Sequence, residues 1–243
     1  MKKHISVFNL MVRSSIWKVL LILGAMAVSQ VILFFAMGAG EEAYLLDALK
    51  RIPSQAVVYI GLILMLFALC LPLSDRGGRM NNLILRLGLP EKEIFWLHVL
   101  FCAVAYWLFI MTQALIMVLL CLIHDWVTPG DMDPMAVFVT SYQHPLFHRF
   151  FPLHDWIGWV NHLLIVIGLS ICTAAQTIKQ RHRYNSICTS IMIVFAAIHF
   201  SSLDTGDHLH FSQIVLPFFV TICVVSVCLY GVLTMEVDDD GKT

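Results

Sequence analysis

The chain has 243 residues, of which 59% are hydrophobic and 13% are charged, whereas about a quarter of the residues in an average soluble domain are charged. A soluble domain of this length has no room to bury so much apolar surface, so the solvent of this chain must be lipid. The net charge of −1 is uninformative because the two signs are segregated along the chain, and no basic block indicates a nucleic-acid surface. The seven cysteines lie in apolar runs without Cys-x-x-Cys spacing, which indicates small packing residues rather than a disulfide framework or zinc site.

Residues 1–15 alternate apolar and basic side chains, as in a short amphipathic helix that lies in the membrane interface. A disordered basic tail is the alternative for this segment. The apolar run that follows is about 23 residues long, which exceeds the core of a cleaved signal peptide. It is therefore expected to be a retained first transmembrane helix.

Six apolar runs predict an all-α membrane protein with six transmembrane helices in a single domain over residues 1–243. Each run must be helical, because the bilayer core offers no water to satisfy the backbone. The third run is about 45 Å long as a helix, so it must tilt or project from the membrane. The fifth is short for a full span and is either extended by its flanks or re-entrant. The predicted spans are 16–38, 55–73, 94–123, 157–177, 186–200 and 211–234.

The distribution of Lys and Arg predicts that both termini are cytoplasmic, since cytoplasmic loops carry the excess of basic residues. With the N-terminus inside, only Lys50, Arg51 and Arg149 fall in outer segments. The inner segments then hold Lys2, Lys3, Arg13, Lys18, Arg76, Arg79, Arg86, Lys92, Lys179, Arg181, Arg183 and Lys242.

The inner loop between the second and third spans predicts a short helix followed by a break. Gly88 is a favourable helix stop, and Pro90 suits the first turn of the next helix. Glu91 and Glu93 then lie at the positive end of that helix dipole. The apolar side of the short helix needs a cover, which either lipid headgroups or a groove on a partner protein supplies.

No motif for catalysis is present in the sequence. The chain lacks the phosphate-loop pattern G-x-x-x-x-G-K-[ST], the zinc-protease pattern H-E-x-x-H and the hydrolase pattern G-x-S-x-G. We therefore expect no enzymatic activity, and any ATP site of this phosphate-loop type must belong to another chain.

The segment LRLGLPEKEIFWLHVLF, residues 85–101, resembles the inner coupling segment of bacterial ABC-2 type transporter permeases. The resemblance implies a multi-pass subunit of the bacterial cytoplasmic membrane that exports peptides such as bacteriocins, lipids or drugs, or confers immunity. It also implies a second permease chain, identical or related, and separate ATPase subunits that bind ATP and Mg²⁺. The residues that would couple to the ATPase are Leu83, Ile84, Leu85, Arg86, Leu87, Gly88, Leu89, Pro90, Glu91, Lys92 and Glu93.

Polar residues inside the predicted spans are costly in lipid and mark either a substrate path or hydrogen bonds between helices. The candidates are Gln30, Gln113, Asn161, His162 and Gln176. Small residues at Ser170 and Ala174 would also allow close helix packing.

The outer segments are rich in His and Asp, which suits either a polar cap or a protein that senses metal ions or protons. The metal candidates are His144, His148, His154, Asp204, His208 and His210. A haem electron carrier is a further alternative, because His98, His162 and His199 lie in or at the ends of spans. Only the outer two, His162 and His199, are placed to share one haem.

Overall fold

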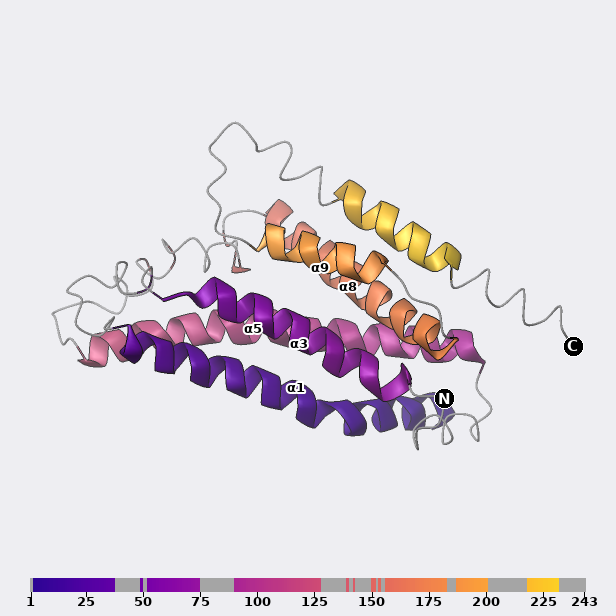
Figure 1. Ribbon diagram of the computed structural model, residues 1–243, viewed down its shortest axis with the longest axis horizontal. Coiled ribbons are helices and arrows are strands. Elements are labelled where there is room, and N and C mark those ends of the chain that lie inside the picture. The colour runs from indigo at the N-terminus through magenta and orange to yellow at the C-terminus, as the bar shows by residue number, and fades with distance from the viewer. Residues whose placement is uncertain are drawn as a thin grey trace, which may run out of the picture.

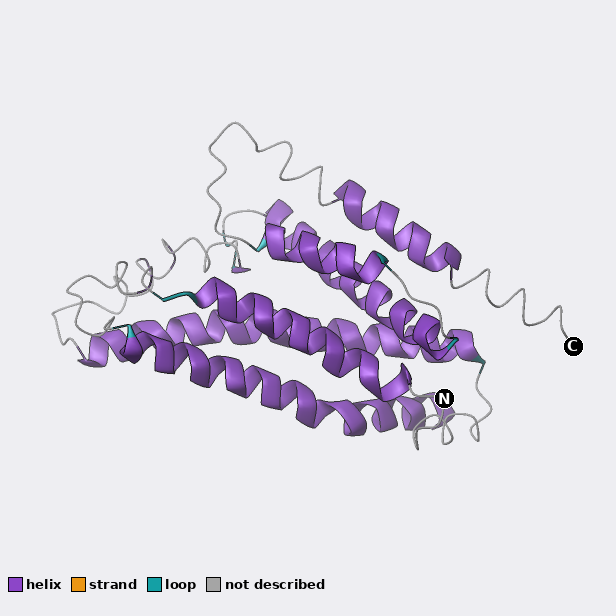
Figure 2. Cartoon of the chain, viewed as in Figure 1, coloured by secondary structure: helices purple, strands orange, loops and turns teal. Residues whose placement is uncertain are grey.

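The computed structural model describes residues 2–37, 49, 52–74, 90–127, 139, 142, 150, 151, 153, 156–182, 187–200 and 218–231. Within these ranges the regular structure is entirely helical, which confirms the predicted all-α class (Figure 2). The helices are α1 (Lys2–Ala36), α3 (Ser54–Ser74), α5 (Glu91–Val127), α8 (Trp156–Arg181), α9 (Cys188–His199) and a last helix, Phe218–Gly231.

Four of these helices are long and apolar enough to cross a membrane: α1, α3, α5 and α8. Their positions match the first four predicted spans. The two shorter apolar helices, α9 and Phe218–Gly231, fall within the predicted fifth and sixth runs. The chain is therefore a helical protein with membrane-spanning character.

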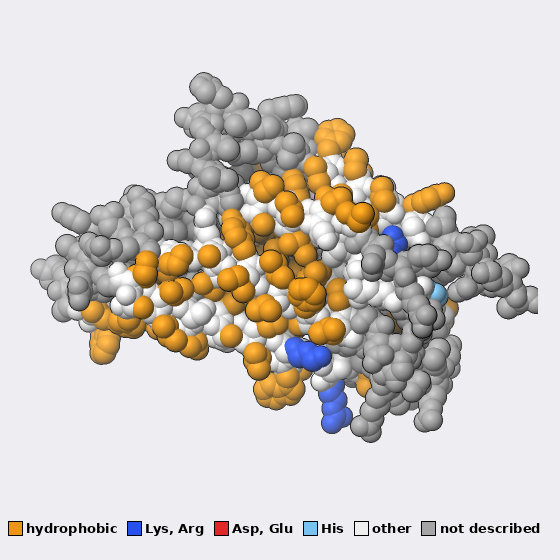
Figure 3. Space-filling view, viewed as in Figure 1, with side chains coloured by type: hydrophobic (Ala, Val, Ile, Leu, Met, Phe, Trp, Pro, Cys, Tyr) orange, Lys and Arg blue, Asp and Glu red, His pale blue; other side chains and the backbone are white. Residues whose placement is uncertain are grey.

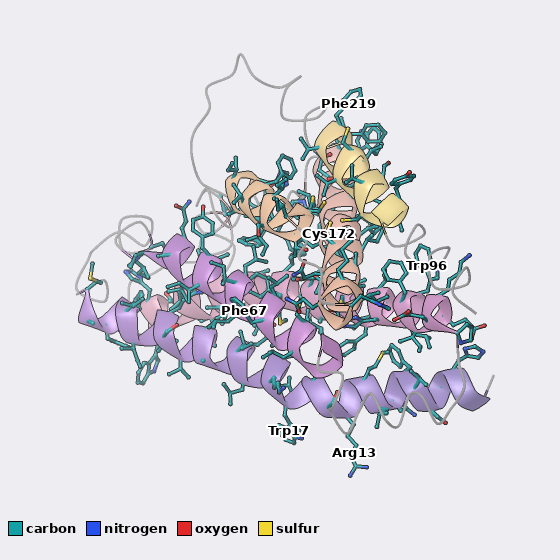
Figure 4. All side chains as sticks on the ribbon, turned by 45° about the vertical axis from the view of Figure 1, so that its right-hand side comes forward. Arg13, Trp17, Phe67, Trp96, Cys172 and Phe219 are labelled. Carbon is teal, nitrogen blue, oxygen red and sulfur yellow. The ribbon has the colours of Figure 1, made fainter. Side chains whose placement is uncertain are left out.

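The helices α1, α3 and α5 lie side by side along the long axis of the molecule (Figure 1). Helix α8 packs against α5 and α3, and α9 packs against α8. Figure 4 shows that α8 and α9 cross the first three helices obliquely. Five of the seven cysteines are buried, and all seven are free, so most of them serve as the small packing residues that the sequence predicts.

Helix α1 differs from its prediction, because residues 2–15 do not form a separate interfacial helix. They are the first turns of one continuous helix of 35 residues. No proline or glycine precedes Gly24 in this helix, so nothing in the sequence breaks it. Val7 and Met11 are buried against Ile94 of α5, so part of the apolar side of this segment packs on protein rather than in the membrane interface.

Helix α5 begins where the sequence predicts and extends beyond the predicted 94–123. The Pro90 carbonyl accepts hydrogen bonds from the Glu93 and Ile94 amides at 3.0 and 3.3 Å, which closes the first turn. Glu91 and Glu93 lie in that turn, at the positive end of the helix dipole. With 37 residues the helix is about 55 Å long, well beyond the hydrocarbon thickness of about 30 Å. The predicted short helix over 83–89 lies outside the described residues.

A glycine allows α8 to approach both α9 and the last helix. A Cβ atom on Gly168 would lie 2.7 Å from Met192 Cε and 2.8 Å from Thr221 Cγ2. Gly24 of α1 has no such neighbour within 4 Å.

We expect Gly168→Leu to destabilise the protein by roughly 1–3 kcal/mol, because the added side chain overpacks this three-helix contact. Gly24→Leu is the matched control and should change stability little. Thermal unfolding in mild detergent measures both variants, and equal melting temperatures would contradict the close approach of these helices.

Candidate functional site

The start of α5 is connected to two other helices by contacts between histidine and carboxylate side chains. His4 Nδ1 of α1 lies 3.5 Å from Glu93 Oε2. His182 Nε2, directly after α8, lies 3.3 and 3.4 Å from the two carboxylate oxygens of Glu91. We call these four residues the α5 joint. The joint brings the N-terminal ends of α1 and α5 and the C-terminal end of α8 together.

Apolar packing lies directly behind the joint. Val7 and Met11 of α1 are buried with Ile94 of α5. About two turns further along α5, the Phe8 and Phe101 rings meet edge to face with centroids 6.4 Å apart. The two His–Glu contacts themselves are partly exposed, and even a charged pair at such a position contributes only about 0–1 kcal/mol. The apolar contacts therefore hold the joint together.

Of the coupling residues that the sequence predicts, the structure describes Pro90, Glu91, Lys92 and Glu93. Glu91 and Glu93 are half-buried in the joint, and Lys92 between them is exposed. The sequence did not single out His4 and His182. The predicted topology could have indicated them, because it places both histidines on the same side of the membrane as Glu91 and Glu93.

Two of the predicted path residues are hydrogen-bonded to each other. Gln30 Nε2 of α1 donates to Gln113 Oε1 of α5 at 2.9 Å, and both side chains are fully buried. Gln113 Nε2 lies 4.0 Å from Met26 Sδ. Gln30 Oε1 has no hydrogen-bond partner in the structure. This amide pair fixes α1 against α5 within the apolar part of both helices.

A second polar contact, which the sequence reading missed, connects α5 to α8. The Tyr106 hydroxyl lies 2.9 Å from Thr173 Oγ1, and Thr173 Oγ1 donates to the Leu169 carbonyl. Both residues are buried. The ring of His98, also on α5, is hydrogen-bonded to the backbone of Leu69 in α3. Helix α5 thus has a polar contact with each of the three long helices around it.

The remaining path candidates lie elsewhere along α8. Asn161 and His162 are buried near its start, whereas Gln176 is half-buried about 21 Å further along the helix. The structure therefore places the five candidates in three separate regions. Gln30 and Gln113 are in direct contact, and the substrate path through the five residues stays a prediction.

His162 lies in an aromatic cluster rather than in a haem-like arrangement. Its ring meets the ring of His199 edge to face with centroids 5.4 Å apart, and it also contacts Phe200. Two imidazoles that share a haem lie on opposite faces of the macrocycle. A direct ring contact leaves no space for that macrocycle, so these residues do not fit a haem.

The predicted metal candidates lie outside the described residues: His144, His148, His154, Asp204, His208 and His210. Within the described ranges, no group of three or more His, Cys, Asp or Glu side chains is arranged to hold a metal ion.

The chain was compared with protein families, curated proteins and solved structures. No protein-family model, no curated protein and no solved structure matches the chain.

We expect Gln113→Leu to cost about 1–3 kcal/mol of stability, because the buried Gln30 amide then loses its acceptor. The double variant Gln30→Leu/Gln113→Leu should recover most of this loss, since it leaves no amide without a partner. Denaturation by SDS in mixed micelles measures the free energy of unfolding. Purely additive losses in the double variant would show that the two amides are not coupled.

Proposed function

We propose that this chain is the membrane-spanning permease subunit of an ATP-driven exporter of the ABC-2 type. In this proposal it lies in a bacterial cytoplasmic membrane with both termini inside and pairs with a second permease chain. Separate ATPase subunits bind ATP and Mg²⁺, so this chain has no catalytic residue of its own. The observation that carries the proposal is the α5 joint, which adjoins the segment that resembles a coupling segment.

The physical argument concerns how a push is transmitted. A force applied at Pro90 to Glu93 acts directly on the first turn of α5, because Glu91 is the first residue of that helix. Helix α5 then continues unbroken to Val127. Because its hydrogen bonds are all internal, such a helix moves as a nearly rigid rod. The push is therefore delivered to the far end of the bundle.

The joint spreads the same movement over neighbouring helices. Glu93 meets His4 of α1, and Glu91 meets His182 at the end of α8. Further along, the Gln30–Gln113 hydrogen bond holds α1 to α5 inside the apolar layer. A displacement of α5 by the ATPase thus carries α1 and α8 with it, as a transporter that changes its access requires.

We expect Leu87→Asp/Leu89→Asp to abolish co-purification of an ATP-binding-cassette ATPase with the affinity-tagged chain. The charges would disrupt the apolar surface that the partner covers in this proposal. Mass spectrometry of the purified complex identifies the ATPase, and its ATP hydrolysis is measured alongside.

Leu153→Asp is the control, because it places a negative charge on an exposed leucine at the predicted outer side. The proposal is wrong if the unsubstituted chain captures no such ATPase. It is also wrong if the double variant keeps the ATPase bound with unchanged hydrolysis.

A further inference from the structure

One face of α1 is exposed along most of the helix and changes from basic to apolar. Its side chains are Arg13, Trp17, Leu21, Val28, Ile32 and Phe35. Steps of three, four and seven residues keep them on one side of a helix. Figure 4 shows Arg13 and Trp17 projecting away from the other helices. Lys18, the next residue after Trp17, is also exposed and projects about 100° further round the helix.

The length of the apolar part matches a bilayer. Phe35 follows Trp17 by eighteen positions, or about 27 Å of helix, against a hydrocarbon thickness of about 30 Å. Arg13, Trp17 and Lys18 consequently lie where the hydrocarbon meets the headgroups. Tryptophan rings and long basic side chains both favour this layer.

The charged side chains of α1 near Trp17 are all basic. Helix α1 contains no Asp or Glu, and the structure assigns neither Arg13 nor Lys18 an ion pair with a described residue. In Figure 3 the Lys and Arg side chains gather toward one end of a surface that is otherwise largely apolar. A phosphate group is the anion that this layer of the membrane supplies, and a guanidinium binds it in a bidentate way.

We propose that Arg13, Trp17 and Lys18 form a binding site for the headgroup of an anionic glycerophospholipid. The two cations contact the negatively charged phosphate, which no headgroup cation neutralises, and the Trp17 ring packs against the glycerol region. The site holds α1 at a fixed height in the bilayer, with residues 2–12 projecting beyond the hydrocarbon. This proposal needs only a membrane-spanning α1 and does not depend on the exporter function.

Native mass spectrometry of the full chain in neutral detergent tests the site, by titration with phosphatidylglycerol or phosphatidylcholine of equal acyl chains. We expect a preference for phosphatidylglycerol that falls roughly five-fold for each basic residue removed in Arg13→Gln and Lys18→Gln. The conservative exchange Arg13→Lys/Lys18→Arg should retain the preference. Trp17→Leu should weaken it, whereas Trp126→Leu, at an exposed tryptophan at the other end of α5, should not.

Lys50→Gln/Arg51→Gln removes the same charge elsewhere and is the control for non-specific attraction. The proposal is overturned if the unsubstituted chain shows no preference for phosphatidylglycerol, or if this control loses as much as Arg13→Gln/Lys18→Gln. Complete displacement of the lipid by an equal concentration of inorganic phosphate would also overturn it, because the site would then bind free phosphate rather than lipid.

Discussion

The packing of α1 against α5 along their whole length is the constraint on which the rest of the molecule depends. Three contacts at different levels along the two helices fix this packing: His4 with Glu93, Gln30 with Gln113, and Phe34 with His124. Lipid provides little hydrophobic driving force between helices, so close packing and hydrogen bonds must hold them. The buried amide pair sets the register of α1 on α5, because a shift by one turn would leave both amides without partners in the apolar layer.

Both helices are about 20 Å longer than the hydrocarbon layer, since they contain 35 and 37 residues. This excess length has two consequences. It brings the start of α5 together with the start of α1 and the end of α8 in the α5 joint. It also places Arg13 and Trp17 at the membrane surface while α1 continues beyond them. A force on the joint and a lipid on α1 would therefore act on the same pair of helices.

The sequence predicted features that depend on local chemistry. The start of α5 followed from Pro90 and the two glutamates, and the four long spans followed from hydropathy. The continuity of α1 was missed because the alternation of apolar and basic residues over 1–15 is typical of a separate interfacial helix. In the structure Ser14 Oγ donates to the Met11 carbonyl, so the serine is satisfied within the helix. The partners of Gln30 and Tyr106 were not predictable, since they depend on how distant helices pack.

The distance between α1 and α5 at their first turns tests this pairing most directly. Spin labels at Ile5 and Leu100 report that end, and labels at Phe35 and Leu122 report the other, in lipid nanodiscs after replacement of the native cysteines. If α1 is one helix packed along α5, pulsed electron–electron double resonance will give a single narrow distance distribution for each of the two pairs. A broad or long distribution for Ile5 and Leu100 alone would show that the first turns of α1 leave α5, which contradicts the α5 joint.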